Sequence, residues 1–220
     1  KSKEDFKNLP ETEFIIEDLI PFKKELATTV ARNKSGQIEI FPIVEMMFND
    51  TSNQVEYVLC PAQISSELNE KAKKIALKVS KSFKQVGLLA VEMFLTHDDK
   101  ILINEVAPRP HNSAHYSIES CVNSQFDQHI NSILDLPLGS SKSNSLAIMI
   151  NLVGELGHEG EVVYDGVKEA MLLNNVKVHI YGKSKTKPNR KMGHATVLDS
   201  NLENALKKAK KIKELVKVKT

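Results

Sequence analysis

The stretch GLLAVEMFLTHDDKILINEVAPRPHNS, residues 87–113, constrains the fold more than any other part of the sequence. Two apolar runs flank the polar group HDDK, which predicts a β-hairpin with strands at 87–95 and 100–106. Pro108 and Pro110 then exclude further pairing, because each lacks an N–H group and restricts the residue before it. The polar side chains that follow are therefore expected on a stiff loop at a strand end, where functional sites are often built. A polar connector without a function is the alternative.

Two glutamates in this hairpin form a candidate metal site. A turn centred between Asp98 and Asp99 would pair Glu92 with Glu105 on one face of the sheet. Like charges in that position repel, and a carboxylate on an apolar strand resists burial. A divalent cation would remove both objections, and oxygen ligands of this kind suit Mg²⁺. Alternatively, one glutamate is exposed, or a turn shifted by one residue puts the two on opposite faces.

The remaining pattern predicts an α/β (α+β) chain whose main element is an antiparallel sheet. Further strands are expected at 13–20, 25–32, 37–45, 54–60, 145–153, 176–182 and 192–198. Helices are expected at 65–86, 113–121, 125–135, 166–173 and from 201, with a capping box at Ser200–Glu203. The Ser-rich stretch LPLGSSKSNS, residues 136–145, resembles a linker. It predicts two domains, 1–139 and 140–220.

Composition excludes several classes of partner. The formal charge of +2 is a near balance of 30 basic and 28 acidic residues. The lysine-rich end, LKKAKKIKELVKVK, has apolar residues at helical spacing, so we interpret it as a solvated helix face rather than a nucleic-acid surface. Cys60 and Cys121 have neither metal-knuckle nor disulfide-framework spacing. No apolar run reaches membrane-spanning length and no signal-peptide pattern is present, which predicts a cytoplasmic protein with no membrane partner.

Three longer motifs resemble one enzyme family. They are INEVAPRPHNSAHYSIES, SQFDQHINSILDLPLG and YGKSKTKPNRKMGHATVL, which begin at residues 103, 124 and 181. With the glutamate pair, they resemble 5-(carboxyamino)imidazole ribonucleotide synthetase, an ATP-grasp ligase of purine biosynthesis, from about residue 14 to the end. The resemblance implies an antiparallel ATP-grasp sheet with helices, a small mixed C-terminal domain and a homodimer. It also implies carboxylation of aminoimidazole ribonucleotide by bicarbonate and ATP through carboxyphosphate.

The resemblance implies a nucleotide-binding role for residues in the first half of the chain. The segment EDLI matches the hinge that holds adenine, and Glu25 matches the residue that binds the ribose hydroxyls. Asn104 is expected beside the ATP phosphates, and Glu92 and Glu105 match the ligands of Mg²⁺, with Mn²⁺ as an alternative metal. The hinge residues are Glu17, Asp18, Leu19 and Ile20.

The same resemblance implies a second group of residues that binds the other substrates. Arg109 matches the catalytic arginine that handles bicarbonate and carboxyphosphate, although a structural bridge to Glu105 is the alternative. Asn112 and Ser113 are expected to shape this pocket, and His111 and His115 to hold the loop. Lys183 and Arg190 match the residues that hold the ribonucleotide phosphate, although a solvated basic loop is the alternative. The neighbouring lysines 185, 187 and 191 are expected to be solvated.

The chain also departs from the family pattern. Met46, Met47 and Phe48 occupy positions where the family often has an Asn and a His, and Ala107 replaces a common Asn. The family's N-terminal domain and its Gly-rich, Lys-bearing phosphate loop are not found, which indicates a C-terminal portion of the enzyme. Formate-dependent glycinamide ribonucleotide transformylase, another ATP-grasp ligase and a non-catalytic module therefore remain alternatives.

Overall fold

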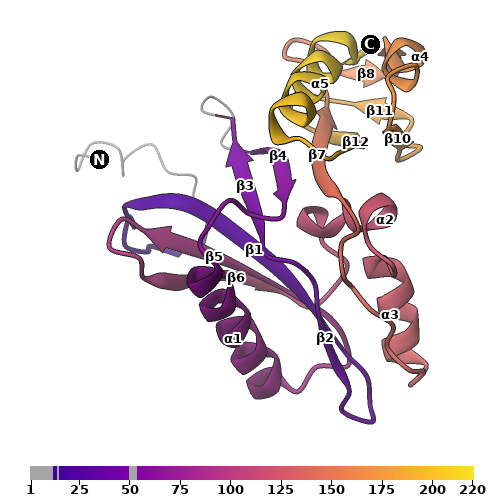
Figure 1. Cartoon of the computed structure of the whole chain (residues 1–220). Helices are drawn as coiled ribbons and strands as arrows, with labels where there is room; N and C mark the ends of the chain where they lie inside the picture. The colour runs from indigo at the N-terminus through magenta and orange to yellow at the C-terminus, as the bar shows by residue number, and fades with distance from the viewer. Residues whose placement is uncertain (1–11, 14, 50–53) are drawn as a thin grey trace.

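The computed structural model describes residues 12–13, 15–49 and 54–220. A nine-stranded antiparallel sheet runs through the molecule in the order β10-β12-β7-β4-β3-β1-β5-β6, with β2 paired to β1 (Figure 1). This confirms the predicted fold class. The strands are β1 Phe22–Arg32, β2 Ile38–Ile40, β3 Val44–Phe48, β4 Val55–Cys60, β5 Gly87–Thr96, β6 Ile101–Ala107, β7 Leu146–Val153, β10 Val176–Ile180 and β12 Lys191–Asp199.

Helix α1 covers one face of the β1–β5–β6 part of the sheet (Figure 1). It spans Ser66–Phe83 and begins where the Ser65 hydroxyl accepts a hydrogen bond from the Leu68 N–H group at 3.2 Å. Its Ala72 and Ala76 pack on the side chains of β1 and β5 that point toward it. On the opposite face of these strands lie Ala27 and its partner Glu92, because successive side chains of a strand alternate between faces.

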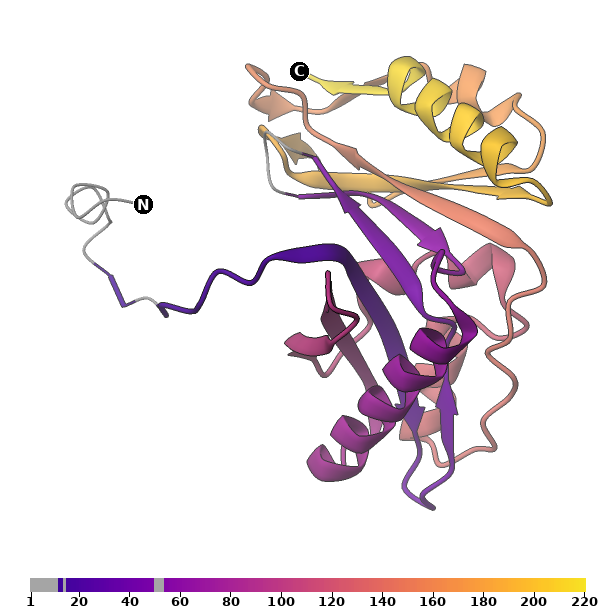
Figure 2. The same cartoon turned by 60° about the vertical axis from the view of Figure 1, so that its left-hand side comes forward.

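The C-terminal part forms a second core around β7, β10 and β12. Helix α5, Leu202–Leu215, packs on β7 and β12 through Ala205, Ala209 and Ile212 (Figure 2). Two short strand pairs complete this part: β8 Gly160–Glu161 with β11 Lys185–Thr186, and β9 Val163–Asp165 with β13 Lys217–Lys219. Strand β7 pairs with β4, so the main sheet continues from the first half of the chain into the second.

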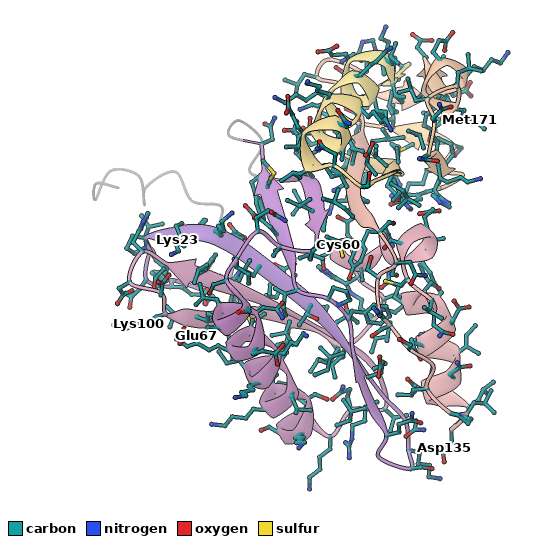
Figure 3. All side chains as sticks on the ribbon, in the orientation of Figure 1. Lys23, Cys60, Glu67, Lys100, Asp135 and Met171 are labelled. Carbon is teal, nitrogen blue, oxygen red and sulfur yellow. The ribbon has the colours of Figure 1, made fainter. Side chains whose placement is uncertain are left out.

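Short helices occupy the connection between the two parts. They are the 3₁₀ turn η2 Asn112–Ala114, α2 Ser117–Ser120 and α3 Gln125–Ile133, followed later by α4 Val167–Met171. Helix α3 packs along β1 and β5 and begins with a capping box between Ser124 and Asp127. Cys60, a buried free thiol at the end of β4, lies near the middle of the molecule (Figure 3). Among the described residues, no helix is both long and apolar enough to cross a membrane.

Three local predictions were wrong. The described residues of 13–20 form no strand, and residue 14 lies outside the described part of the chain. The segment 37–45 holds β2 and the start of β3, separated by a break at Phe41–Ile43. Helix α5 begins from Asn201, whose side chain accepts a hydrogen bond from the Asn204 N–H group, so Ser200 does not cap it. Asn is as good a cap as Ser, which is why the sequence alone did not separate them.

The β5–β6 hairpin forms as predicted, but with a different turn. Thr96 pairs with Lys100 and Asp99 has a positive φ of 59°, so the loop is His97–Asp99 and its centre is Asp98. The side chain of Lys23 on β1 forms an ion pair with Asp99; Lys23 and Lys100 lie at the same end of the sheet (Figure 3). This ion pair connects the turn of the β5–β6 hairpin to strand β1.

Candidate active site

The predicted adenine hinge lies at one end of the sheet. Residues 17–20 line a hollow together with Phe22 and Phe94 and with residues 102–104 of β6. The rings of Phe22 and Phe94 stack with their centroids 4.7 Å apart, and Leu19 is 96% exposed. The structure therefore brings Glu17, Asp18, Leu19 and Ile20 next to Asn104. An open surface of aromatic and aliphatic side chains beside backbone polar groups suits a flat heterocyclic ring.

The two candidate metal ligands meet at a β-bulge. Val91 pairs with Val106 as predicted, but the next pair is Met93 with Ile103, so β6 has one extra residue. Glu92 therefore faces both Asn104 and Glu105, and the bulge compensates for the shifted turn. A bulge bends its strand and redirects side chains, which is how the carboxylates come together despite the one-residue error in the predicted turn.

The charges around Glu92 create a site that favours a cation. Burial, followed by the neighbouring Glu105 carboxylate, raises the pKa of Glu92. On β1, Glu25 points to the same face, and burial together with the Glu92 carboxylate raises its pKa to about 7. Like charges that lie close together repel one another, and a bound cation relieves that repulsion. Oxygen donors of this kind fit Mg²⁺, which binds through one or two carboxylates and otherwise through water and phosphate.

The proline-bounded loop places Arg109 beside these carboxylates. The Arg109 side chain is exposed, and its Nη1 donates to the Pro110 carbonyl oxygen at 3.2 Å. Its positive charge lowers the pKa of Glu92, so the guanidinium acts on the carboxylate site. In the described chain no ion pair joins Arg109 to Glu105, so the structure does not favour the bridge between them.

Buried Gln125 fixes the loop that follows Arg109. Its side chain accepts from the His111 N–H group at 2.8 Å and donates to the His111 carbonyl oxygen at 2.9 Å. His111 Nε2 lies 3.5 Å from a Glu92 oxygen, and burial lowers the pKa of His111 to about 4. Ser113 is buried with its hydroxyl 2.9 Å from His111 Nδ1, so it orients this imidazole. The loop is therefore held rigidly at the edge of the carboxylate site.

Asn112 connects this loop to the C-terminal part of the chain. Its side-chain amide exchanges two hydrogen bonds with Asn151 on β7, at 2.8 and 3.0 Å. Lys191, the first residue of β12, donates from Nζ to Asn112 Oδ1 at 3.3 Å. Burial lowers the pKa of Lys191, and the Glu92 carboxylate opposes that effect. The prediction that Lys191 is solvated was wrong, because β12 starts beside the loop and directs this side chain inward.

The two predicted phosphate-binding residues lie in the loop before β12. Lys183 Nζ donates to the Lys191 carbonyl oxygen at 2.6 Å and lies over the ring of Tyr181. Arg190 donates to the Lys185 carbonyl oxygen at 2.9 Å. Both side chains are half-buried. Lys183 therefore lies beside Lys191, whereas the Arg190 side chain contacts the backbone of β11.

Three histidine rings stack beside Tyr181, and the sequence did not predict this cluster. His194 on β12 stacks between His115 and His179, with ring centroids 4.8 and 4.5 Å away. Tyr181 Oη lies 3.0 Å from His194 Nδ1, and His179 Nε2 lies 2.6 Å from a Glu119 oxygen. The GHA and VHI segments were visible in the sequence, but only the pairing of β10 with β12 brings their histidines together.

Two family models match the sequence of this chain. The sequence model of the ATP-grasp domain matches residues 1–126, more than half of the chain. The model of the phosphoribosylaminoimidazole carboxylase C-terminal domain matches residues 147–208. The chain belongs to the ATP-grasp family.

Within that family, the chain resembles N5-carboxyaminoimidazole ribonucleotide synthetases. It is 40% identical over 184 residues to the synthase of Bacillus subtilis, covering 84% of this chain and 46% of the relative. The Thermotoga maritima synthetase structure is 43% identical with a TM-score of 0.91, covering 100% of this chain and 59% of that one. An Aspergillus clavatus structure, described as a complex with ADP and 5-aminoimidazole ribonucleotide, is 34% identical with a TM-score of 0.79, covering 89% and 52%. The chain thus spans about half the length of these relatives.

Proposed function

We propose that the chain is part of a ligase that carboxylates 5-aminoimidazole ribonucleotide, using bicarbonate and ATP. The products are 5-(carboxyamino)imidazole ribonucleotide, ADP and phosphate, with carboxyphosphate as the intermediate. One observation carries the proposal: the carboxylates of β5 and β6 lie beside a loop that carries Arg109 and that is hydrogen-bonded through Asn112 to β7 and β12. The relatives named for this activity support the same choice of substrates.

The first half of the chain binds the nucleotide. Glu17, Asp18, Leu19 and Ile20 hold adenine through side-chain and backbone contacts, and Glu25 binds the ribose hydroxyls. Asn104 contacts the phosphates. Glu92 and Glu105 would hold Mg²⁺, or Mn²⁺ in its place, which would supply positive charge next to the phosphates. The mutual repulsion of these carboxylates supports the metal, because a cation stabilises both.

The loops at residues 107–113 and 181–190 bind the other two substrates. Bicarbonate is a poor electrophile, and its phosphorylation converts one oxygen into a leaving group. Arg109 binds this oxyanion through its planar guanidinium, which matches a carboxylate fork. Asn112 and Ser113 shape the pocket, Ser113 through His111. Lys183 and Arg190 bind the ribonucleotide phosphate, which is consistent with their place on a loop that carries several cations.

The organisation of the protein is proposed on the same resemblance. A boundary near residue 140 separates an ATP-grasp part, 1–139, from a small C-terminal domain, 140–220. The ranges of the two matched domains support this division. We further propose a cytoplasmic homodimer in purine biosynthesis whose partners are small molecules, not nucleic acid or membrane.

Substrate-dependent ADP release tests the proposal. The protein is expressed from its complete reading frame and assayed with Mg²⁺-ATP, and bicarbonate and aminoimidazole ribonucleotide are each omitted in turn. We expect release only when both are present. Glu92→Gln and Glu105→Gln should weaken Mg²⁺-ATP binding, whereas Glu169→Gln, an exposed control on α4, should not. Formate in place of bicarbonate supporting turnover on glycinamide ribonucleotide would support the transformylase. Absence of both activities and of Mg²⁺-ATP binding would indicate a non-catalytic module.

A further inference from the structure

A cluster of nitrogen and oxygen ligands lies where α2 meets the C-terminal part of the sheet. His179 on β10 and His194 on β12 are direct cross-strand partners, and their imidazole rings stack with centroids 4.5 Å apart. Glu119 on α2 reaches the same place, with one carboxylate oxygen 2.6 Å from His179 Nε2. One ligand atom from each of the three side chains lies within 4.8 Å of the other two. Three segments of the chain therefore bring metal-binding groups to one point.

Two polar atoms of this cluster are buried and unsatisfied. Within the described part of the chain, His194 Nε2 and Glu119 Oε2 have no hydrogen-bond partner. His194 is 2% exposed, so the protein shields its ring from bulk water. A buried polar atom without a partner destabilises the fold, and such atoms are rare in proteins. The contact between Glu119 and His179 involves the other carboxylate oxygen, so it accounts for neither of the two unsatisfied atoms.

Tyr181 orients His194 as a metal ligand requires. The hydroxyl oxygen of Tyr181 lies 3.0 Å from His194 Nδ1. A neutral imidazole carries one N–H group, and an Nδ1–H group that donates to Tyr181 leaves a lone pair on Nε2. Metal-binding histidines almost always donate their other N–H group to a neighbouring acceptor in this way. His115 also stacks on His194, but its Nδ1 already lies 2.8 Å from the side-chain nitrogen of Gln125.

We propose that Glu119, His179 and His194 form a binding site for a divalent transition-metal ion such as Zn²⁺. Two imidazole nitrogens and one carboxylate oxygen are typical ligands of Zn²⁺, whereas Mg²⁺ prefers oxygen ligands alone. Ligand atoms about 2.0–2.2 Å from a zinc ion lie roughly 3.3 Å apart in a tetrahedral site, so a small movement closes this cluster on the ion. The side chain of His179 is 34% exposed, which gives the ion a path from solvent.

The bound ion would connect two parts of the chain. Glu119 belongs to the short helices after β6, whereas both histidines belong to the C-terminal strands. An ion held by all three side chains binds the folded protein and not the unfolded chain, so it stabilises the fold. The site uses none of the residues of the proposed Mg²⁺ site, and it does not depend on the proposed ligase activity.

Calorimetric titration with Zn²⁺ tests the site directly. The protein is expressed from its complete reading frame, treated with a chelator, and titrated in excess Mg²⁺, which competes for the carboxylates of β5 and β6. Tyr181→Phe should weaken Zn²⁺ binding about ten- to hundred-fold, the usual effect of losing a group that orients a ligand. His179→Gln removes a ligand from a partly exposed position and should weaken binding further. His97→Gln, which replaces an exposed histidine of the β5–β6 turn, is the control and should bind as wild type does.

Thermal unfolding provides a second readout. Zn²⁺ should raise the melting temperature of wild type and of His97→Gln but not that of His179→Gln, because only the intact site binds the ion. Equal affinity of wild type and His179→Gln for Zn²⁺, or no binding by wild type, would overturn the proposal. Loss of binding in Glu92→Gln but not in His179→Gln would also overturn it, because the ion would then bind at the carboxylates of β5 and β6. Neither measurement requires turnover, so both stand if the ligase activity is absent.

Discussion

Acidification should destabilise the protein through its buried histidine stack. His194 is 2% exposed and lies between the rings of His115 and His179. Burial, followed by the charges of these two neighbours, lowers the pKa of His194 to about 3. Burial, followed by the charge of His111, lowers the pKa of His115 to about 4. The folded protein therefore keeps both imidazoles neutral at a pH at which an unfolded chain protonates them.

The direction and size of the effect follow from proton linkage. An unfolded histidine has a pKa of about 6.5, so the unfolded chain binds the proton first as the pH falls. The contribution to stability is fully present above pH 6.5 and is lost as the pH falls toward the folded pKa values. At pH 5, which is about 1.5 units below the unfolded value, each histidine lowers the free energy of unfolding by about 2 kcal/mol relative to pH 8.

Urea unfolding between pH 8 and 5 measures this loss. Because other groups also titrate, the comparison is with His194→Asn, which removes one titrating imidazole. This variant is expected to be less stable at pH 8 but to lose about 2 kcal/mol less than wild type on acidification. His97→Asn, a replacement of an exposed histidine in the β5–β6 turn, is the control and should follow wild type. Parallel pH dependence of wild type and His194→Asn would refute the reasoning.

Two further predictions concern local structure. Ser65→Ala removes the hydroxyl that accepts the Leu68 N–H group and should lower the free energy of unfolding by about 1 kcal/mol, whereas Ser66→Ala should have little effect; urea midpoints compare the two. A Cβ at Gly154 would lie 2.2 Å from the carbonyl oxygen of Lys187, so Gly154→Ala should displace the basic loop. Binding of aminoimidazole ribonucleotide should then weaken more than binding of ATP, and an equal change in both would contradict this explanation.

Local patterns were sufficient to predict the hairpin and the rigid loop. Alternating apolar runs, a polar turn and two prolines are short-range signals, and β5, β6 and the loop after them form as these signals indicate. The prediction of a strand at residues 13–20 failed because a short-range signal does not show whether a pairing partner is present. Apolar residues such as Ile15 and Ile16 favour a strand, but a strand needs a partner, and both side chains are more than two-thirds exposed in the described structure.

Long-range pairing decided the parts of the site that the sequence left open. The turn prediction was wrong by one residue, and only the bulge in β6 brings Glu105 toward Glu92. Lys191 was indistinguishable from Lys185 and Lys187 in a run of basic residues, because charge patterns do not specify which side chain the sheet directs inward. The histidine stack likewise depends on the pairing of β10 with β12.

The sequence by itself therefore determined most of the longer helices and strands, the chemistry available in each motif and the family to which these motifs belong. The tertiary structure determined which charges share one environment. The physical reason is that backbone propensity and turn formation act over a few residues, whereas pKa values and ion binding depend on burial and on charges from distant segments. Arg109 and Lys191 are 82 positions apart in the sequence, and the sheet places both within the electrostatic field of Glu92.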